Sequence, residues 1–203
     1  IVYLLCHVLV TALRRRSPAF FWVLFGVLYV GATAFAVPPA ARIFGRAPLG
    51  CEMPWEASPS GLAVLPHACL LNRHYLRIAT VQRLEEINSQ FAASHAGSRF
   101  TVLETGFPFL DGFPLLPHLS HNDGNKVDLA YFYRDRKENA PIGSGSPSPI
   151  GFFVTETPRA GDALPCADRF TPLRWSFWWF RDGKRNWVLD EARTADLVKL
   201  LAG

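Results

Sequence analysis

The residues best suited to chemistry lie in segment 117–133, which reads PHLSHNDGNKVDLAYFY. His121, Gly124 and Asp128 follow one another there in the pattern H-x-x-G-x-x-x-D. Gly124 allows the chain to turn, so that the imidazole and the carboxylate can converge on one point. Both groups are good zinc ligands, and a carboxylate that interrupts an apolar strand needs a partner or a metal ion. By spacing alone, a surface or hydrogen-bonded His–Asp pair is the more usual interpretation, with a metal site as the alternative that the position of Asp128 in an apolar strand supports.

Residues 120–128 resemble the zinc motif of the group that unites lysostaphin-type peptidases, D-Ala-D-Ala peptidases and the hedgehog signalling domain. The motif is most similar to that of penicillin-insensitive murein endopeptidases and the related D-Ala-D-Ala peptidases. In that group the first His and the Asp bind zinc, so the resemblance implies these roles for His121 and Asp128. It extends over residues 70–203 and implies zinc-dependent hydrolysis of peptide bonds in peptidoglycan.

The resemblance also implies a third zinc ligand and a general base. The family takes this ligand from a His near the C-terminus, and no His follows Asp128 here. We therefore expect residues 1–203 to be incomplete at the C-terminus and inactive alone, because catalytic zinc sites use three protein ligands. His118 is an alternative ligand, although a supporting position in the loop is expected for it. Arg73 is a candidate for binding a substrate carboxylate, with plain surface charge as the alternative.

The elements expected around the motif indicate the α+β class, with an antiparallel sheet flanked by helices. Strands are predicted over 99–105, 127–133, 150–155 and 174–180. A first helix is predicted over 80–94 from apolar residues at helical spacing, namely Val81, Leu84, Ile87 and Phe91. A last helix is predicted over 190–201, with one side formed by Ala192, Ala195, Val198 and Leu201. This order places the motif in the loop between the first two strands.

The uncharged segment 19–37 predicts a transmembrane helix, because about 20 apolar residues cross the hydrocarbon core. Residues 1–13 are also apolar and are interpreted as the remnant of an earlier membrane segment. The basic run Arg14–Arg16 favours a cytoplasmic N-terminal side. We therefore expect an inner (cytoplasmic) membrane protein with its C-terminal domain in the periplasm. A signal-peptide core and a buried core helix are the alternatives for 19–37.

Composition divides the rest of the chain into a linker over 38–66 and a peptidase-like domain over 67–203. Residues 1–42 hold four Arg and no acid, which leaves 17 basic and 17 acidic residues in 43–203. A neutral domain argues against nucleic acid as a partner, since phosphate binding needs a basic face. Outside the cytoplasm disulfides can form, and Cys51 with Cys69 is the expected pair, with Cys166 left over.

These observations predict a membrane-anchored zinc metallopeptidase that acts on peptidoglycan peptides. The first alternative is a non-catalytic cell-wall-binding domain of the same fold. The second alternative is a small membrane protein whose exported domain stabilises a partner.

Overall fold

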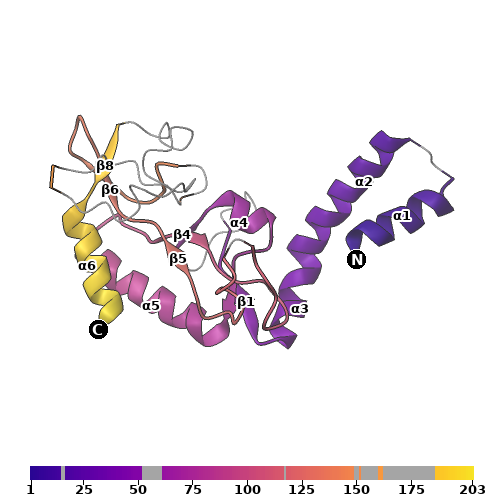
Figure 1. Ribbon diagram of the computed structural model, residues 1–203, viewed down its shortest axis with the longest axis horizontal. Coiled ribbons are helices and arrows are strands. Elements are labelled where there is room, and N and C mark those ends of the chain that lie inside the picture. Colours follow the sequence, from indigo (N-terminus) through magenta and orange to yellow (C-terminus); the bar gives the residue numbers. More distant parts are fainter. Residues whose placement is uncertain (15–16, 52–60, 117, 149–150, 152–159, 162–185) are drawn as a thin grey trace.

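The computed structural model describes residues 1–14, 17–51, 61–116, 118–148, 151, 160–161 and 186–203. Two apolar helices at the N-terminus form a hairpin that projects from an α+β part (Figure 1). The predicted strand 174–180, nearly all of the predicted strand 150–155, and Cys166 lie outside the described residues.

The projecting hairpin contains α1 (Val2–Ala12), α2 (Pro18–Gly31), the π-helical turn η1 (Ala32–Ala36) and α3 (Val37–Ile43). The last three form one apolar helix, Pro18–Ile43, which is long and apolar enough to cross a membrane. It is longer than the predicted span 19–37. Pro38 and Pro39 lack amide hydrogens and crowd the carbonyls four residues before them. The wider π turn directly before these prolines takes up the crowding, so the helix continues to Ile43.

The α+β part contains three small sheets, where one antiparallel sheet was predicted. The first pairs β1 (Arg46–Pro48) with β3 (Tyr75–Arg77) in antiparallel fashion. The second has the order β2 (Ala63–Val64), β4 (Thr101–Glu104), β5 (Asp128–Leu129), with a parallel β2–β4 pair. The third has the order β7 (Pro141–Ile142), β6 (Tyr133–Asp135), β8 (Trp187–Leu189) and is antiparallel. The α+β class is therefore correct. The first and third sheets are antiparallel, and the second is mixed.

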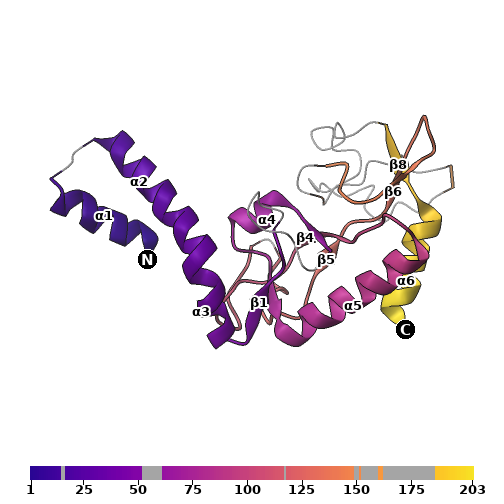
Figure 2. The same ribbon diagram turned by 180° about the vertical axis from the view of Figure 1, so that it is seen from behind.

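Three helices accompany these sheets: α4 (Pro66–Leu70), α5 (Ile78–Ser94) and α6 (Glu191–Ala202). The predicted helix over 80–94 is confirmed in α5, and all four of its predicted apolar residues are buried. Phe91 stacks on Phe132 with ring centroids 4.8 Å apart, which joins α5 to the segment between β5 and β6. Helices α5 and α6 lie side by side in both views (Figures 1 and 2).

The predicted strand 127–133 is divided between two sheets. Residues 128–129 pair with β4, whereas residues 133–135 pair with β7 and β8. The amide of Ala130 still donates to the carbonyl of Thr101, but the chain then leaves the second sheet. The break leaves Asp128 at the start of a two-residue strand, beside the end of β4.

The predicted last helix is confirmed in α6, but its buried residues lie outside the apolar side named for it. Val198 and Leu201 are exposed in α6, and the buried residues are Arg193 and Leu197. Arg193 is buried because its guanidinium donates to the carbonyls of Tyr133 and Ile142 and to the Ser98 hydroxyl. These acceptors offset the cost of removing the charge from water. A prediction from hydrophobic periodicity alone does not take such acceptors into account.

The segment 38–66, predicted as a linker, contributes to the folded part. Leu49 and Leu62 are buried in the same core as α5, and β1 and β2 both lie in this range. A disulfide joins Cys51 to Cys69, with a Cα–Cα distance of 5.9 Å, in agreement with the predicted pair. The chain therefore passes from the apolar helix directly into the sheet that supports the candidate site.

Candidate metal centre

Four potential ligands converge where β4 ends and β5 begins: Glu104, His118, His121 and Asp128. Each offers one nitrogen or oxygen atom, and these atoms all lie within 4.8 Å of one another. Glu104 is the last residue of β4 and is in register with Asp128 of β5. The two histidines come from the loop that joins these strands. The structure thus brings the predicted pair together and adds a glutamate and a second histidine.

His121 is held in an orientation suited to a metal ligand. Its Nδ1 lies 3.1 Å from the carbonyl oxygen of Thr105, to which it donates, so that Nε2 faces Asp128. Nε2 lies 3.2 Å from Asp128 Oδ1. The hydrogen bond with Asp128 raises the pKa of His121 despite partial burial. A backbone carbonyl that fixes the other ring nitrogen is the usual support of a metal-binding imidazole.

Asp128 lies between the two histidines and is partly exposed. Burial by itself would raise the pKa of this carboxyl, but the hydrogen bond from His121 and the charges of both imidazoles bring it below its usual value. The carboxylate is therefore ionised at neutral pH. One of its oxygens faces each imidazole.

His118 connects the two carboxylates. Its Nδ1 lies 2.5 Å from Glu104 Oε2 and 3.1 Å from Asp128 Oδ2. Burial lowers the pKa of His118 more than the Asp128 charge raises it, so the imidazole is neutral at neutral pH. His118 is therefore in close contact with Glu104 as a neutral imidazole.

Arg73 lies on the inner side of the cluster. Its Nε forms an ion pair with Glu104 Oε1, and its Nη1 donates to the carbonyl of Leu116 at 2.8 Å. Glu104 is 3% exposed, so this guanidinium offsets the charge of a buried carboxylate. Among the described residues, the Arg73 side chain contacts Glu104 and the Leu116 carbonyl. Its predicted role in binding a substrate carboxylate stays a prediction.

Arg46 fixes the loops that carry the motif. It is 1% exposed, and it donates to the carbonyl of Phe107 at 2.5 Å and to Asp111 Oδ1 at 2.6 Å. Gly124 adopts φ +73°, and a Cβ there would lie 3.0 Å from the Arg46 Cζ. The predicted turn at Gly124 is thus confirmed, and close packing against Arg46 gives a second reason for glycine at this position.

The separations within the cluster fit a tetrahedral zinc ion. Ligand bonds of about 2.0–2.1 Å in tetrahedral geometry place two ligand atoms about 3.3 Å apart. His121 Nε2 lies 3.2 Å from Asp128 Oδ1 and His118 Nδ1 lies 3.1 Å from Asp128 Oδ2, which is close to this edge, although the two contacts use different carboxylate oxygens and have the length of hydrogen bonds as well. The 2.5 Å contact of His118 with Glu104 is too short for two ligands of one ion. His118, His121 and Asp128 therefore fit as ligands, and Glu104 fits as the carboxylate beside them.

Sequence reasoning missed Glu104 and Arg46. The available signal at Glu104 was a carboxylate at the end of a strand whose four residues are all buried, since such a group needs a partner. Arg46 was interpreted only as a charge that flanks the membrane segment. A further group of potential ligands among the described residues, Cys51, Cys69 and His74, has both sulfurs in the disulfide.

The chain matches no protein-family model, and comparisons with curated proteins and with solved structures give no match either.

Proposed function

We propose that the chain is a membrane-anchored zinc metallopeptidase that cleaves peptide bonds in peptidoglycan. The observation that carries the proposal is the convergence of ligand atoms from His118, His121, Asp128 and Glu104 within 4.8 Å of one another. The resemblance of residues 120–128 to the zinc motif of murein peptidases supports the substrate class. When bound, zinc would supply an acidified water molecule and a Lewis acid for the scissile carbonyl.

The residues around the proposed metal site have distinct tasks. His121 and Asp128 bind the ion, with His121 oriented by the Thr105 carbonyl. His118 Nδ1 would provide the third ligand within residues 1–203, so the proposal replaces the inactivity that the sequence led us to expect for these residues. Glu104 Oε2, which lies 2.5 Å from His118 Nδ1, would serve as the general base. Arg73 holds Glu104 Oε1, so that only Oε2 is available for this role.

The test combines zinc content with digestion of purified murein by the full chain in detergent. His121→Ala and Asp128→Ala should lose both zinc and muropeptide release, as should the wild type after treatment with a chelator. Glu104→Gln should keep its zinc and lose about 100-fold or more in kcat, the usual contribution of a general base. His95→Gln, which changes the histidine directly after α5 and outside the cluster, is the matched control.

The alternative of a non-catalytic cell-wall-binding domain makes a different prediction in the same experiment. Zinc would bind, and binding to murein would depend on His121 and Asp128, but no muropeptide would be released. Release of muropeptides that is unaffected by the chelator and by both substitutions would reject the metallopeptidase and the assigned residues together.

A further inference from the structure

The most informative surface outside the metal centre lies between the long apolar helix and the α+β part. The Tyr29 hydroxyl donates to the carbonyl of Leu70 at 2.6 Å, and the Asn72 amide donates to the Thr33 hydroxyl at 3.1 Å. The end of α4 is therefore attached to the middle of the Pro18–Ile43 helix. The hydrogen bonds fix the height of the domain along that helix.

The positions of these contacts place the end of α4 within the depth of a bilayer. The basic run Arg14–Arg16 precedes the apolar helix in the sequence, and a hydrocarbon core is about 30 Å thick. At about 1.5 Å per residue, Tyr29 lies about 17 Å and Thr33 about 23 Å from Pro18. A helix that crosses the membrane therefore carries Leu70–Asn72 below the far surface of the hydrocarbon, and tilt increases their depth.

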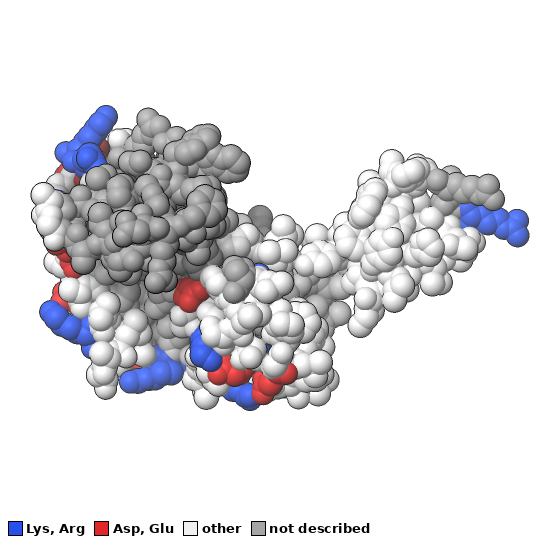
Figure 3. All heavy atoms as spheres, in the orientation of Figure 1, with Lys and Arg blue, Asp and Glu red and all other residues white. Residues whose placement is uncertain are grey.

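The composition of this part of the domain suits such a position. Residues 61–72 contain no Lys, Arg, Asp or Glu. Leu70 and Leu71 are 55% and 52% exposed, which is costly in water for two adjacent leucines. Leu116, whose carbonyl is bonded to Arg73, is 72% exposed. On the face of the projecting hairpin drawn in Figure 3, charge is seen only at its far end, and Arg42 lies in the last turn of the long helix.

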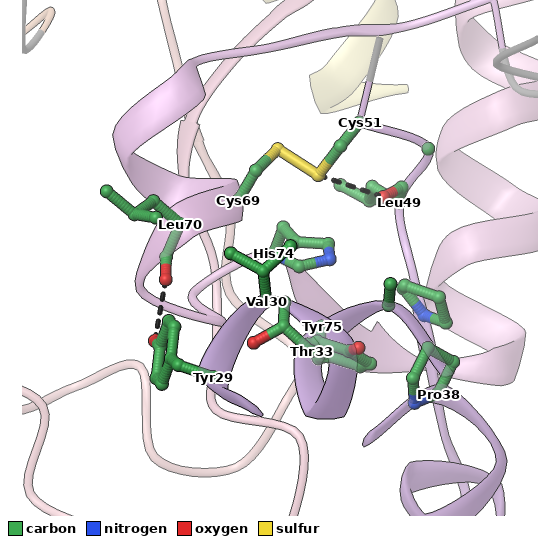
Figure 4. A pocket seen from close by; sticks show the side chains of 13 residues that line it. Tyr29, Val30, Thr33, Pro38, Leu49, Cys51, Cys69, Leu70, His74 and Tyr75 are labelled. Atoms are coloured by element: carbon green, nitrogen blue, oxygen red, sulfur yellow. Dashed lines mark hydrogen bonds between the residues drawn. A yellow bond between two sulfur atoms is a disulfide. The ribbon is translucent and has the colours of Figure 1, made fainter. Parts of the chain in front are cut away.

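An apolar cavity of about 90 Å³ lies at the same junction (Figure 4). One wall comes from the long helix, with Val30 and Ala34, and the other comes from the domain, with Leu49, Leu70 and the disulfide. An apolar cavity of this kind is poorly suited to water, which needs several polar partners. At this depth the molecules that surround it are lipid acyl chains.

We propose that the end of α4, with Leu70 and Leu71, and the neighbouring loop at Leu116 are immersed in the bilayer that the long helix crosses. The domain is thus partly embedded in the lipid surface, whereas a domain on a flexible tether would lie outside the bilayer. Arg73 links this surface to the metal centre, because it bonds both Leu116 and Glu104. The metal centre consequently lies close to the lipid headgroups.

Spin-label accessibility in the full chain tests this proposal. Single cysteines replace Leu71, Leu116, Val23 on α2 or Lys199 on α6, in a chain that carries Cys6→Ser and Cys166→Ser and keeps the disulfide. All four positions are exposed, so the labels should leave the fold intact. The protein is reconstituted in phosphatidylcholine–phosphatidylglycerol vesicles. Collision rates are then measured with oxygen, which concentrates in lipid, and with a water-soluble nickel chelate.

Labels at 71 and 116 should favour oxygen over nickel, as the label at 23 does, and the label at 199 should show the opposite preference. An oxygen preference at 23 together with a nickel preference at 71 and 116 would overturn the immersion and leave the membrane span intact. A nickel preference at all four positions would overturn both. Neither readout depends on zinc or on hydrolysis, so the result is independent of the proposed function.

Discussion

Replacement of Arg46 by alanine should destabilise the folded part far more than the same change at Arg77. Both guanidinium groups pair with Asp111, at 2.6 and 2.5 Å, so the two variants lose a similar ion pair. They differ in burial, because Arg46 is 1% exposed, whereas the Arg77 side chain is 41% exposed. The comparison therefore isolates the contribution of a buried guanidinium that supports the motif loops.

The magnitude follows from the contacts that only Arg46 makes. It donates to the buried carbonyl of Phe107 at 2.5 Å, and a hydrogen bond from a charged donor contributes about 1.5–3 kcal/mol. Truncation also leaves a cavity beneath Gly106 and Gly124, which pack on this side chain. Together these losses amount to about 3 kcal/mol or more for Arg46→Ala, against about 1–2 kcal/mol for Arg77→Ala, which loses a partly exposed ion pair and the hydrogen bond from its Nε to the Asp123 carbonyl at 3.0 Å.

Chemical denaturation of the full chain in detergent micelles, followed by tryptophan fluorescence, measures both free energies of unfolding. Arg46→Lys should recover little, because an ammonium group does not reproduce the planar fork that reaches two acceptors. Equal losses of stability for Arg46→Ala and Arg77→Ala would show that the Arg46 contacts contribute nothing beyond a surface ion pair. The proposed support of the loop that carries His121 would then be untenable.

Three further predictions concern positions outside the ligand set. Gly124→Ala should cost about 1–2 kcal/mol more than Gly112→Ala in thermal unfolding, since both have positive φ but only the Cβ at 124 meets Arg46. Replacement of Cys51 and Cys69 by alanine opens a loop with a sequence separation of 18 and should lower the unfolding free energy by about 3 kcal/mol. Burial lowers the pKa of His74 from 6.5 to about 4, so the unfolded chain takes up a proton first as the pH falls. The contribution of His74 to the free energy of unfolding should be complete above pH 6.5 and should decrease by up to about 3 kcal/mol toward pH 4. Denaturation curves measured in parallel on His74→Gln should lack this decrease.

The sequence predicted those features that short-range patterns encode. The spacing of His121, Gly124 and Asp128 lies within eight residues, and the structure brings the two potential ligands to 3.2 Å. The apolar residues of α5 repeat with the helical period, and all four are buried. The pair Cys51–Cys69 followed from the small number of cysteines in the part after the apolar helix.

The features that could not be predicted depend on partners distant in sequence. Glu104, Arg46 and Arg193 are all charged and buried, and each contacts a group distant in the chain, namely Arg73, Phe107 and Ser98, although Arg193 also pairs with the nearby Asp190. No periodicity marks such residues, because burial depends on where carbonyls and opposite charges lie in the folded chain. The same reason explains the error in α6, where Arg193 faces inward and Val198 faces outward.

The apolar helix and the start of the domain were also divided incorrectly. Pro38 and Pro39 were taken as the beginning of a linker, since proline normally ends a helix. The π turn Ala32–Ala36 removes that obstacle, and the helix runs on to Ile43, shortly before Arg46 enters β1. The long helix is consequently joined by a very short connection to the β1–β3 sheet, whose Arg46 packs against Gly124 of the motif.

Zinc stoichiometry of the purified full chain tests the metal centre most directly. Metal content after dialysis against dilute zinc, measured by elemental analysis, should be one zinc per chain for the wild type. His121→Ala and Asp128→Ala should bind none. Asp123→Ala, which changes an exposed carboxylate in the same loop, should bind one. No zinc in the wild type, or the same zinc content in all four proteins, would contradict the assignment of His121 and Asp128 as ligands.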